Sequence, residues 1–199
     1  MIIKKEILFS ELNIKKDEAL RYAGVKGEAD EITLELFDKA YELLAECIKP
    51  RAVYKYADVA YTDDSVVIGG EAIRSASLKT FLQGSSKCVL MAATAGIEAD
   101  RLINRYSMVM PSLALMIDAL SAAAVEALCN KLCSCKFCVK EQCRFSPGYG
   151  DFPIDYQKRI INELSAELNI GVTLTNSLML APSKSVTAII PVKDVDYDN

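Results

Sequence analysis

The chain has 199 residues and 51% of them are hydrophobic, which is enough to bury the core of one domain over residues 1–199. Its net charge of −4, with no clustered basic stretch, argues against nucleic-acid binding. Seven cysteines with no recognisable secretory or transit signal predict a cytoplasmic protein. Histidine is absent, which excludes a Ser-His-Asp triad and imidazole metal sites.

Apolar residues recur at helical spacing in the first eighty residues. Asp30 is expected to cap a helix that Pro50 ends, with an apolar stripe facing the core. Alternating apolar residues at 51–61 and a short apolar run at 66–68 predict a hairpin around the Asp63-Asp64 turn. Two shorter helices are expected at 13–22 and 77–82.

The second half of the sequence contains most of the expected core. Residues 88–93 predict a buried strand, and a helix from Pro111 to about Leu132 is apolar nearly all round. Asp118 and Glu126 interrupt its apolar run, which is too short to predict a membrane span. The other expected elements are a helix at 96–106, an amphipathic helix that includes Leu168 and ends at Gly171, strands at 174–180 and 185–192, and a frayed tail at 193–199.

The order of these elements predicts the fold class. Strands and helices do not alternate regularly, and no glycine-rich loop follows a first strand, so a doubly wound nucleotide-binding fold is disfavoured. An α+β domain with a mostly antiparallel sheet fits the pattern better.

The loop at 144–153 combines one arginine, two glycines, two prolines and a tyrosine directly before a predicted helix. Such a loop can present a guanidinium to a carboxylate, a ring face to a flat base or a sulfonium cation, and polar groups to a purine or ribose. Asp151 could instead neutralise the arginine within the loop, which would make the pair structural. The expected ligand-binding residues of the loop are Arg144, Ser146, Pro147, Gly148 and Tyr149.

Glu126 is a further candidate because it lies inside an otherwise apolar helix, where a carboxylate is costly unless it is paired. Its carboxylate could meet a ligand's ammonium or sulfonium group. Alternatively, it pairs with Lys131 or Arg144, or lies at the solvated edge of the helix.

Five cysteines fall within fifteen residues, and Cys135-x-x-Cys138 has the spacing of a metal or redox pair. The candidate ligands for zinc or an iron–sulfur cluster are Cys133, Cys135, Cys138 and Cys143. Their spacing matches no standard zinc or ferredoxin pattern. The alternative is that Cys129 and Cys133 are small core residues and that Cys135 and Cys138 are free thiols in a loop.

Three segments resemble the S-adenosylmethionine-binding activation domain of cobalamin-dependent methionine synthase: Arg144-x-Ser146-Pro147-Gly148-Tyr149, Leu174–Ser177 and Ser185–Thr187. The resemblance is clearest over residues 87–191. It implies a bent antiparallel sheet flanked by helices, with S-adenosylmethionine bound by the Arg144 loop and Glu126 near the ligand. The sequence departs from the family pattern at Ile189, Ile190 and Pro191, where aromatic residues are expected, and at Cys138, where an acid is expected and Glu141 lies close by.

The resemblance also implies a function: a stand-alone reactivation protein for a cobalamin-dependent methionine synthase, in methionine biosynthesis, or for a related corrinoid methyltransferase. S-adenosylmethionine would be the methyl donor for reductive remethylation of cob(II)alamin, and no general base is required of this chain. The cobalamin would lie on a partner chain, since this chain lacks histidine and room for further modules. A flavodoxin or ferredoxin would supply the electron. Two alternatives stay open: a cysteine-cluster metal or iron–sulfur electron-transfer protein, and a non-binding assembly subunit of the same fold.

Overall fold

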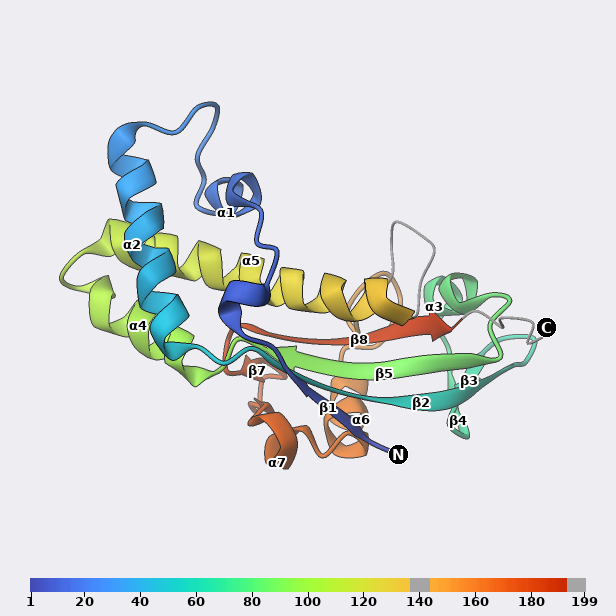
Figure 1. The fold of residues 1–199 in the computed structure, drawn as a ribbon. Coiled ribbons are helices and arrows are strands. Elements are labelled where there is room, and N and C mark those ends of the chain that lie inside the picture. Colours follow the sequence, from blue (N-terminus) through green and yellow to red (C-terminus); the bar gives the residue numbers. More distant parts are fainter. Residues whose placement is uncertain (137–143, 193–199) are drawn as a thin grey trace, which may run out of the picture.

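The computed structural model describes residues 1–136 and 144–192, and an antiparallel sheet forms its centre (Figure 1). The order across the sheet is β4-β3-β2-β5-β8, while β1 pairs with the first residues of β2 and every pairing is antiparallel. The strands of this sheet are β1 (Ile3–Glu6), β2 (Arg51–Tyr61), β3 (Val66–Ile68), β4 (Glu71–Ile73), β5 (Lys87–Thr94) and β8 (Ser185–Val192).

The register of the central strands gives the sheet two buried faces. Tyr54 of β2 lies opposite Met91 of β5, and Met91 lies opposite Ala188 of β8. These three side chains belong to one hydrophobic core, whereas their neighbours Leu90 and Ile189 belong to the other, because successive side chains of a strand point to opposite faces. Burial on both sides explains why β5 reads as a nearly continuous apolar run.

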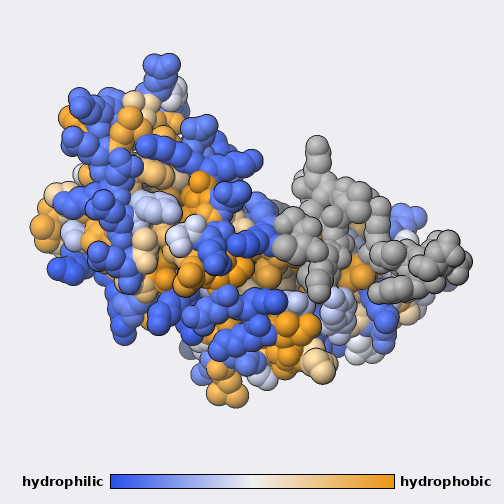
Figure 2. Space-filling view, in the orientation of Figure 1, coloured by the Kyte–Doolittle hydropathy of each residue, from blue (hydrophilic) through white to orange (hydrophobic). Residues whose placement is uncertain are grey.

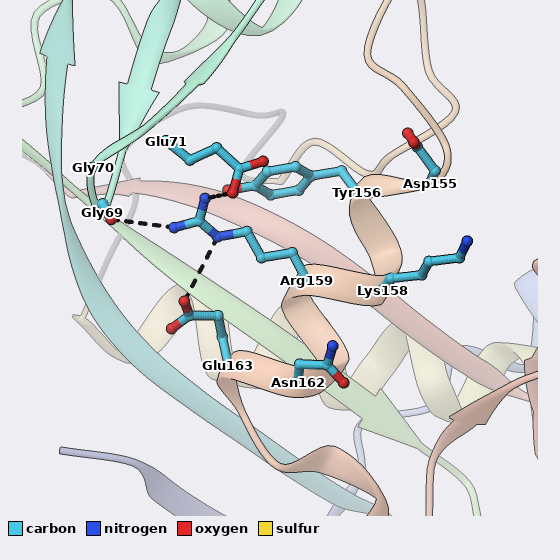
Figure 3. Close-up of a pocket in the computed structure, with 9 residues that line it drawn as sticks. All are labelled: Gly69, Gly70, Glu71, Asp155, Tyr156, Lys158, Arg159, Asn162 and Glu163. Atoms are coloured by element: carbon cyan, nitrogen blue, oxygen red, sulfur yellow. Dashed lines mark hydrogen bonds and ion pairs between the residues drawn. The ribbon is translucent and has the colours of Figure 1, made fainter.

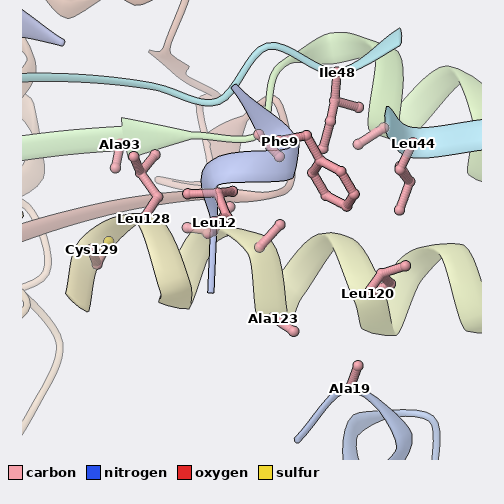
Figure 4. Close-up of a cluster of buried hydrophobic side chains, with 14 of the residues drawn as sticks. Phe9, Leu12, Ala19, Leu44, Ile48, Ala93, Leu120, Ala123, Leu128 and Cys129 are labelled. Atoms are coloured by element: carbon pink, nitrogen blue, oxygen red, sulfur yellow. The ribbon is translucent and has the colours of Figure 1, made fainter. Parts of the chain in front are cut away.

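The long helix α5 (Pro111–Lys136) runs along the first face of the sheet (Figure 1). Side chains from α5, from the 3-10 turn η1 (Phe9–Glu11) and from the other helices of this face meet in one cluster, which includes Phe9, Leu44 and Leu120 (Figure 4). The other helices of this face are α1 (Lys16–Tyr22), α2 (Glu31–Cys47) and α4 (Ile97–Ser107). As expected from the sequence, Asp30 caps α2 by accepting a hydrogen bond from the Thr33 N–H (2.8 Å).

Shorter elements cover the second face of the sheet. Apolar side chains of α3, α6, α7 and the loop before α6 pack against β5 and β8 there, and Phe152 of the loop and Ile160 of α6 are among the fully buried ones. These elements are α3 (Ala76–Leu82), α6 (Tyr156–Glu163), α7 (Ala166–Ile170) and a small separate hairpin of β6 (Thr173–Leu174) and β7 (Leu180–Ala181). Apart from α3, the elements that cover this face come after the loop at 144–153 in the sequence.

Among the described residues, one helical segment, Pro111–Cys133, is long and apolar enough to cross a membrane, with a mean hydropathy of 1.7 over its best window. In the folded chain, 67% of that window is buried among the other elements, as is usual for the core helix of a compact fold. The helix also runs to Lys136, beyond the end near Leu132 that the sequence predicts. On the face drawn in Figure 2, hydrophilic residues predominate and hydrophobic ones form smaller patches among them.

Two sequence predictions about the C-terminal third are wrong. The predicted single helix divides at Ser165, which has φ 45°, and this turns Leu168 outward so that 89% of it is exposed rather than buried. The strand expected over 174–180 is replaced by the two-residue strands β6 and β7, because Leu178 at φ 61° turns the chain between them. The tail at 193–199 lies outside the described residues.

Candidate functional site

The loop that begins at Arg144 is attached to the free edge of the sheet. Phe145 forms an antiparallel bridge with Ile189 of β8, in which each N–H donates to the other residue's carbonyl at 2.9 Å. The Phe145 ring also stacks on Phe81 of α3 (5.1 Å between centroids) and on Phe152 (6.1 Å). Two backbone bonds and two ring contacts thus fix the start of the loop against β8.

Arg144 reaches from this anchored loop to α5. Its Nη1 donates to Asn130 Oδ1 at 2.8 Å, and its Nη2 forms an ion pair with Glu126 Oε2. The Arg144 side chain is 18% exposed and that of Glu126 is 34% exposed, so solvent screens this pair only in part. Of the alternatives for Glu126, pairing with Arg144 is the one found; Lys131 Nζ instead donates to the Glu11 carbonyl.

The surroundings of Arg144 keep its guanidinium charged. Burial acts to lower the pKa of Arg144, but the Cys129 thiol, once ionised at high pH, and the Glu126 carboxylate outweigh that effect, and the net shift is upward. Burial raises the pKa of the Cys129 thiol to about 12, so this cysteine stays protonated next to the cation. The site therefore holds one permanent positive charge and one carboxylate in contact.

Asp151 does not neutralise Arg144. Its carboxylate accepts from the Ser75 hydroxyl (2.6 Å) and from the backbone N–H groups of Ala76 (2.6 Å) and Ser77 (3.0 Å), at the start of α3. These donors, Ser75 first, hold the pKa of Asp151 far below its usual range. Gly150 allows this close approach, because a Cβ there would lie 2.6 Å from Ser77 Oγ. Asp151 thus anchors the loop to the start of α3. It does not pair with Arg144, whose side chain lines the cavity described next.

A cavity of about 680 Å³ opens beside Arg144, within the size range of small-molecule sites. Its wall combines α5, the loop, the first turn of α6 and the start of β8. The sequence-predicted residues that line it are Glu126, Arg144, Ser146, Pro147 and Tyr149. Tyr149 is 65% exposed at the cavity and its ring lies 6.3 Å from that of Phe145.

Gly148 has a structural place in the turn of the loop and does not line the cavity among the described residues. Its φ is 93° and its N–H donates to the Phe152 carbonyl at 2.8 Å. The side chains of Ile189 and Ile190 are buried in the two cores, at 0% and 1% exposure. The departures from the family pattern at these two positions thus fall within the cores and outside the lining of this cavity among the described residues.

Other residues that line the cavity were not predicted to bind a ligand, among them Asn130, Gln157 and Thr187, although Thr187 lies in the Ser185–Thr187 segment that carries the family resemblance. Asn130 carried a usable signal, since it follows Glu126 by four residues and so shares its helix face. Gln157 on α6 and Thr187 on β8 are thirty residues apart in sequence and meet only through the fold, with Thr187 Oγ1 donating to Gln157 Oε1 at 3.3 Å.

A second, larger cleft of about 920 Å³ lies between α6 and the turn at Gly69-Gly70 (Figure 3). Arg159 crosses it and is 16% exposed. Its Nη2 donates to the carbonyls of Ile68 (3.1 Å) and Gly69 (3.2 Å), and it forms ion pairs with Glu71 and Glu163. Because Nη1 and Nη2 of Arg159 already have partners within the protein, this cleft offers less to a ligand than its size suggests.

The proposed cysteine ligands lie mostly beyond the described structure. Cys138 and Cys143 are outside the described residues, as is the side chain of Cys135. Cys129 and Cys133 are buried thiols at 0% and 2% exposure, one turn apart on α5. Within residues 1–136 and 144–192, no group of three or more potential metal-ligating side chains is found.

Comparison with known proteins yields neither a matching family model nor a matching curated protein. Among solved structures, the chain is similar to the MetH reactivation domain bound to AdoHcy, with a TM-score of 0.75 and 19% sequence identity. The match covers 99% of this chain and 80% of that one. The fold is shared. The predicted α+β class, with an antiparallel sheet flanked by helices, is therefore confirmed.

Proposed function

We propose that this chain binds S-adenosylmethionine in the Arg144 cavity and serves as a reactivation protein for a corrinoid methyltransferase carried by a partner chain. Its fold is that of a domain whose solved structure contains AdoHcy, the demethylated form of this methyl donor. In the proposed reaction, one electron and the methyl group convert the partner's cob(II)alamin to methylcobalamin, and AdoHcy is left. A flavodoxin or ferredoxin as electron donor and a cytoplasmic location are parts of the same proposal.

The observation that supports this proposal most directly is the Arg144–Glu126 ion pair on the wall of a ligand-sized cavity. The amino-acid end of S-adenosylmethionine is a zwitterion, with a carboxylate and an ammonium on one carbon atom. Arg144 can bind the carboxylate through donors beyond the two used by Glu126 and Asn130, while Glu126 accepts from the ammonium. A zwitterion fits this pair without leaving either charge unbalanced.

The rest of the cavity suits the remainder of the ligand. Tyr149 presents an exposed ring, which can stack on a base or attract a sulfonium cation. Ser146 and Ser77 offer hydroxyl groups on the same wall. No residue of this chain has to accept a proton, because the methyl group leaves sulfur without a proton transfer. The task of the chain is to hold and orient the donor.

The test is calorimetric titration of S-adenosylmethionine into anaerobically prepared wild-type protein, Arg144→Ala and the control Arg105→Ala. Arg105 lies on α4, is exposed and is absent from the described lining of the cavity. We expect saturable binding that Arg144→Ala weakens by about 100-fold or more, as expected for loss of one partner of a half-buried charge pair, while Arg105→Ala matches wild type within twofold.

Equilibrium dialysis with labelled ligand serves as a second readout when the heat is small. Absence of binding by wild type in both measurements would refute the proposal for the isolated chain. Binding that survives unchanged in Arg144→Ala would show that the ligand site lies elsewhere.

A further inference from the structure

Gln157 is a buried polar side chain on the wall of the Arg144 cavity. It lies in the first turn of α6 and is 6% exposed. Thr187 of β8, 2% exposed, lines the same cavity next to it. Buried amides are costly unless their hydrogen bonds are satisfied, so the partners of this one need to be accounted for.

Two hydrogen bonds fix the orientation of the Gln157 amide. Its Nε2 donates to the Leu178 carbonyl at 3.2 Å, and its Oε1 accepts from the Thr187 hydroxyl at 3.3 Å. Turning the amide over would set Oε1 against the Leu178 carbonyl, two acceptors facing each other. Leu178 has φ 61°, a conformation uncommon for leucine, and this strained turn places its carbonyl at the amide.

The fixed amide keeps unused hydrogen-bonding capacity. A glutamine side chain has two donor hydrogens and two acceptor lone pairs, and one of each is used. One N–H and one lone pair remain on the amide of a residue that borders the cavity. This donor–acceptor pair is complementary to the edge of adenine, where the 6-amino group donates and a neighbouring ring nitrogen accepts.

We propose that Gln157, held in place by Thr187, recognises the 6-amino edge of the ligand's adenine base and so determines the specificity of the site for an adenosyl group. This inference rests on the proposed function, since it assigns the base of the same ligand. The cavity then has two parts: a charged part at Arg144 and Glu126 for the amino acid, and a neutral hydrogen-bonding part at Gln157 for the purine. Hypoxanthine has a carbonyl oxygen at its 6-position in place of the amino group. This oxygen would face Gln157 Oε1, so that two acceptors would oppose each other and weaken binding.

The experiment compares AdoHcy with S-inosylhomocysteine, the same thioether with hypoxanthine in place of adenine. Both are titrated into wild-type protein, Gln157→Met, Thr187→Val and the control Gln83→Met. Gln83 is an exposed glutamine at the end of α3 and does not line this cavity among the described residues. Circular dichroism and a urea transition confirm that each variant is folded before its affinity is interpreted.

We expect wild type and Gln83→Met to prefer AdoHcy by about 10- to 100-fold, the usual range for one well-placed pair of hydrogen bonds to a base. Gln157→Met should bring this ratio close to one by weakening AdoHcy alone, and Thr187→Val should give an intermediate ratio. A merely structural role for Gln157 would weaken both ligands equally and preserve the ratio, which would overturn the inference.

The inference and the proposed function fail in different ways. If wild type binds AdoHcy and S-inosylhomocysteine equally, base recognition by Gln157 is refuted while the proposed function stands. If wild type binds neither thioether nor S-adenosylmethionine, the proposed function itself is refuted and the inference falls with it.

Discussion

Arg144 and Arg159 are both half-buried arginines beside large cavities, yet their hydrogen bonding differs. Arg159 donates to two backbone carbonyls and forms ion pairs with two carboxylates, which joins α6 to the turn between β3 and β4. The contacts found for Arg144 are with the Glu126 carboxylate, the Asn130 amide oxygen and the neighbouring cysteine thiols of α5. The larger cavity is the one at Arg159.

Under the proposed function, the smaller of the two cavities is the binding site, so cavity size alone would point to the wrong one. An arginine whose donors are used by fixed backbone carbonyls stabilises the fold, and a ligand would have to break those bonds to reach it. An arginine paired with a single carboxylate, itself 34% exposed, can exchange that partner for a ligand at lower cost. The comparison therefore predicts that the two arginines affect different measurements.

The largest effect is expected for Arg159→Met, which keeps the apolar stem and removes the donors. It should lower the free energy of unfolding by about 1–3 kcal/mol, because the Ile68 and Gly69 carbonyls and the Glu71 carboxylate lose a donor, while Glu163 keeps its ion pair with Lys55. S-adenosylmethionine affinity, measured on folded protein, should stay within twofold. Urea denaturation and calorimetry measure the two quantities. The control is Lys158→Met, at the exposed residue directly before Arg159. Loss of binding without loss of stability would reverse the roles of the two arginines.

A smaller effect is expected for Arg144→Lys. Lysine keeps the positive charge but cannot form the fork that reaches Glu126 and Asn130 together. S-adenosylmethionine affinity should fall about tenfold, or about 1.4 kcal/mol, with a change in unfolding free energy below about 1 kcal/mol. Titration calorimetry with Arg105→Lys as control measures the first and urea denaturation the second. Wild-type affinity in Arg144→Lys would mean that charge alone is recognised.

The smallest effect is expected for Asp151→Asn and should depend on pH. Because the folded-state pKa of Asp151 is depressed, its contribution to stability is complete above the unfolded-state pKa near 4 and is lost as the pH falls toward the folded value. Wild type and variant should therefore differ most in urea midpoint at pH 7, and the difference should shrink below about pH 4. A difference that is equal at pH 7 and pH 3 would show that the carboxylate charge does not support the loop.

Local signals predicted most of the fold. The strand expected at 185–192 is β8, residue for residue, and the cap at Asp30 begins α2 as the sequence indicates. The break at Ser165 was not predictable, because neither glycine nor proline stands there and the helical period continues through Leu168. The strands β6 and β7 are two residues long, too short for an alternating pattern to show.

The residues of the candidate site likewise include some that local sequence signals predicted and some that they did not. The composition of the loop identified Arg144, Ser146, Pro147 and Tyr149, and the cost of a carboxylate in an apolar helix identified Glu126. Gln157 was not singled out because a glutamine is common on any surface, and Thr187 was named only within the resembling segment Ser185–Thr187, without a role at the cavity. Only the packing of α6 beside β8 buries them together on the wall of the cavity.

The bridge between Phe145 and Ile189 has a consequence for solubility. β8 is the last strand of the sheet, and an open strand edge is a template for pairing with other chains. Phe145 occupies the Ile189 position of that edge, and Pro191 near its end has no N–H to offer a neighbouring strand. The loop that starts at Arg144 thus also protects the sheet from self-association, so changes that detach it would promote aggregation and would also disrupt the proposed binding site.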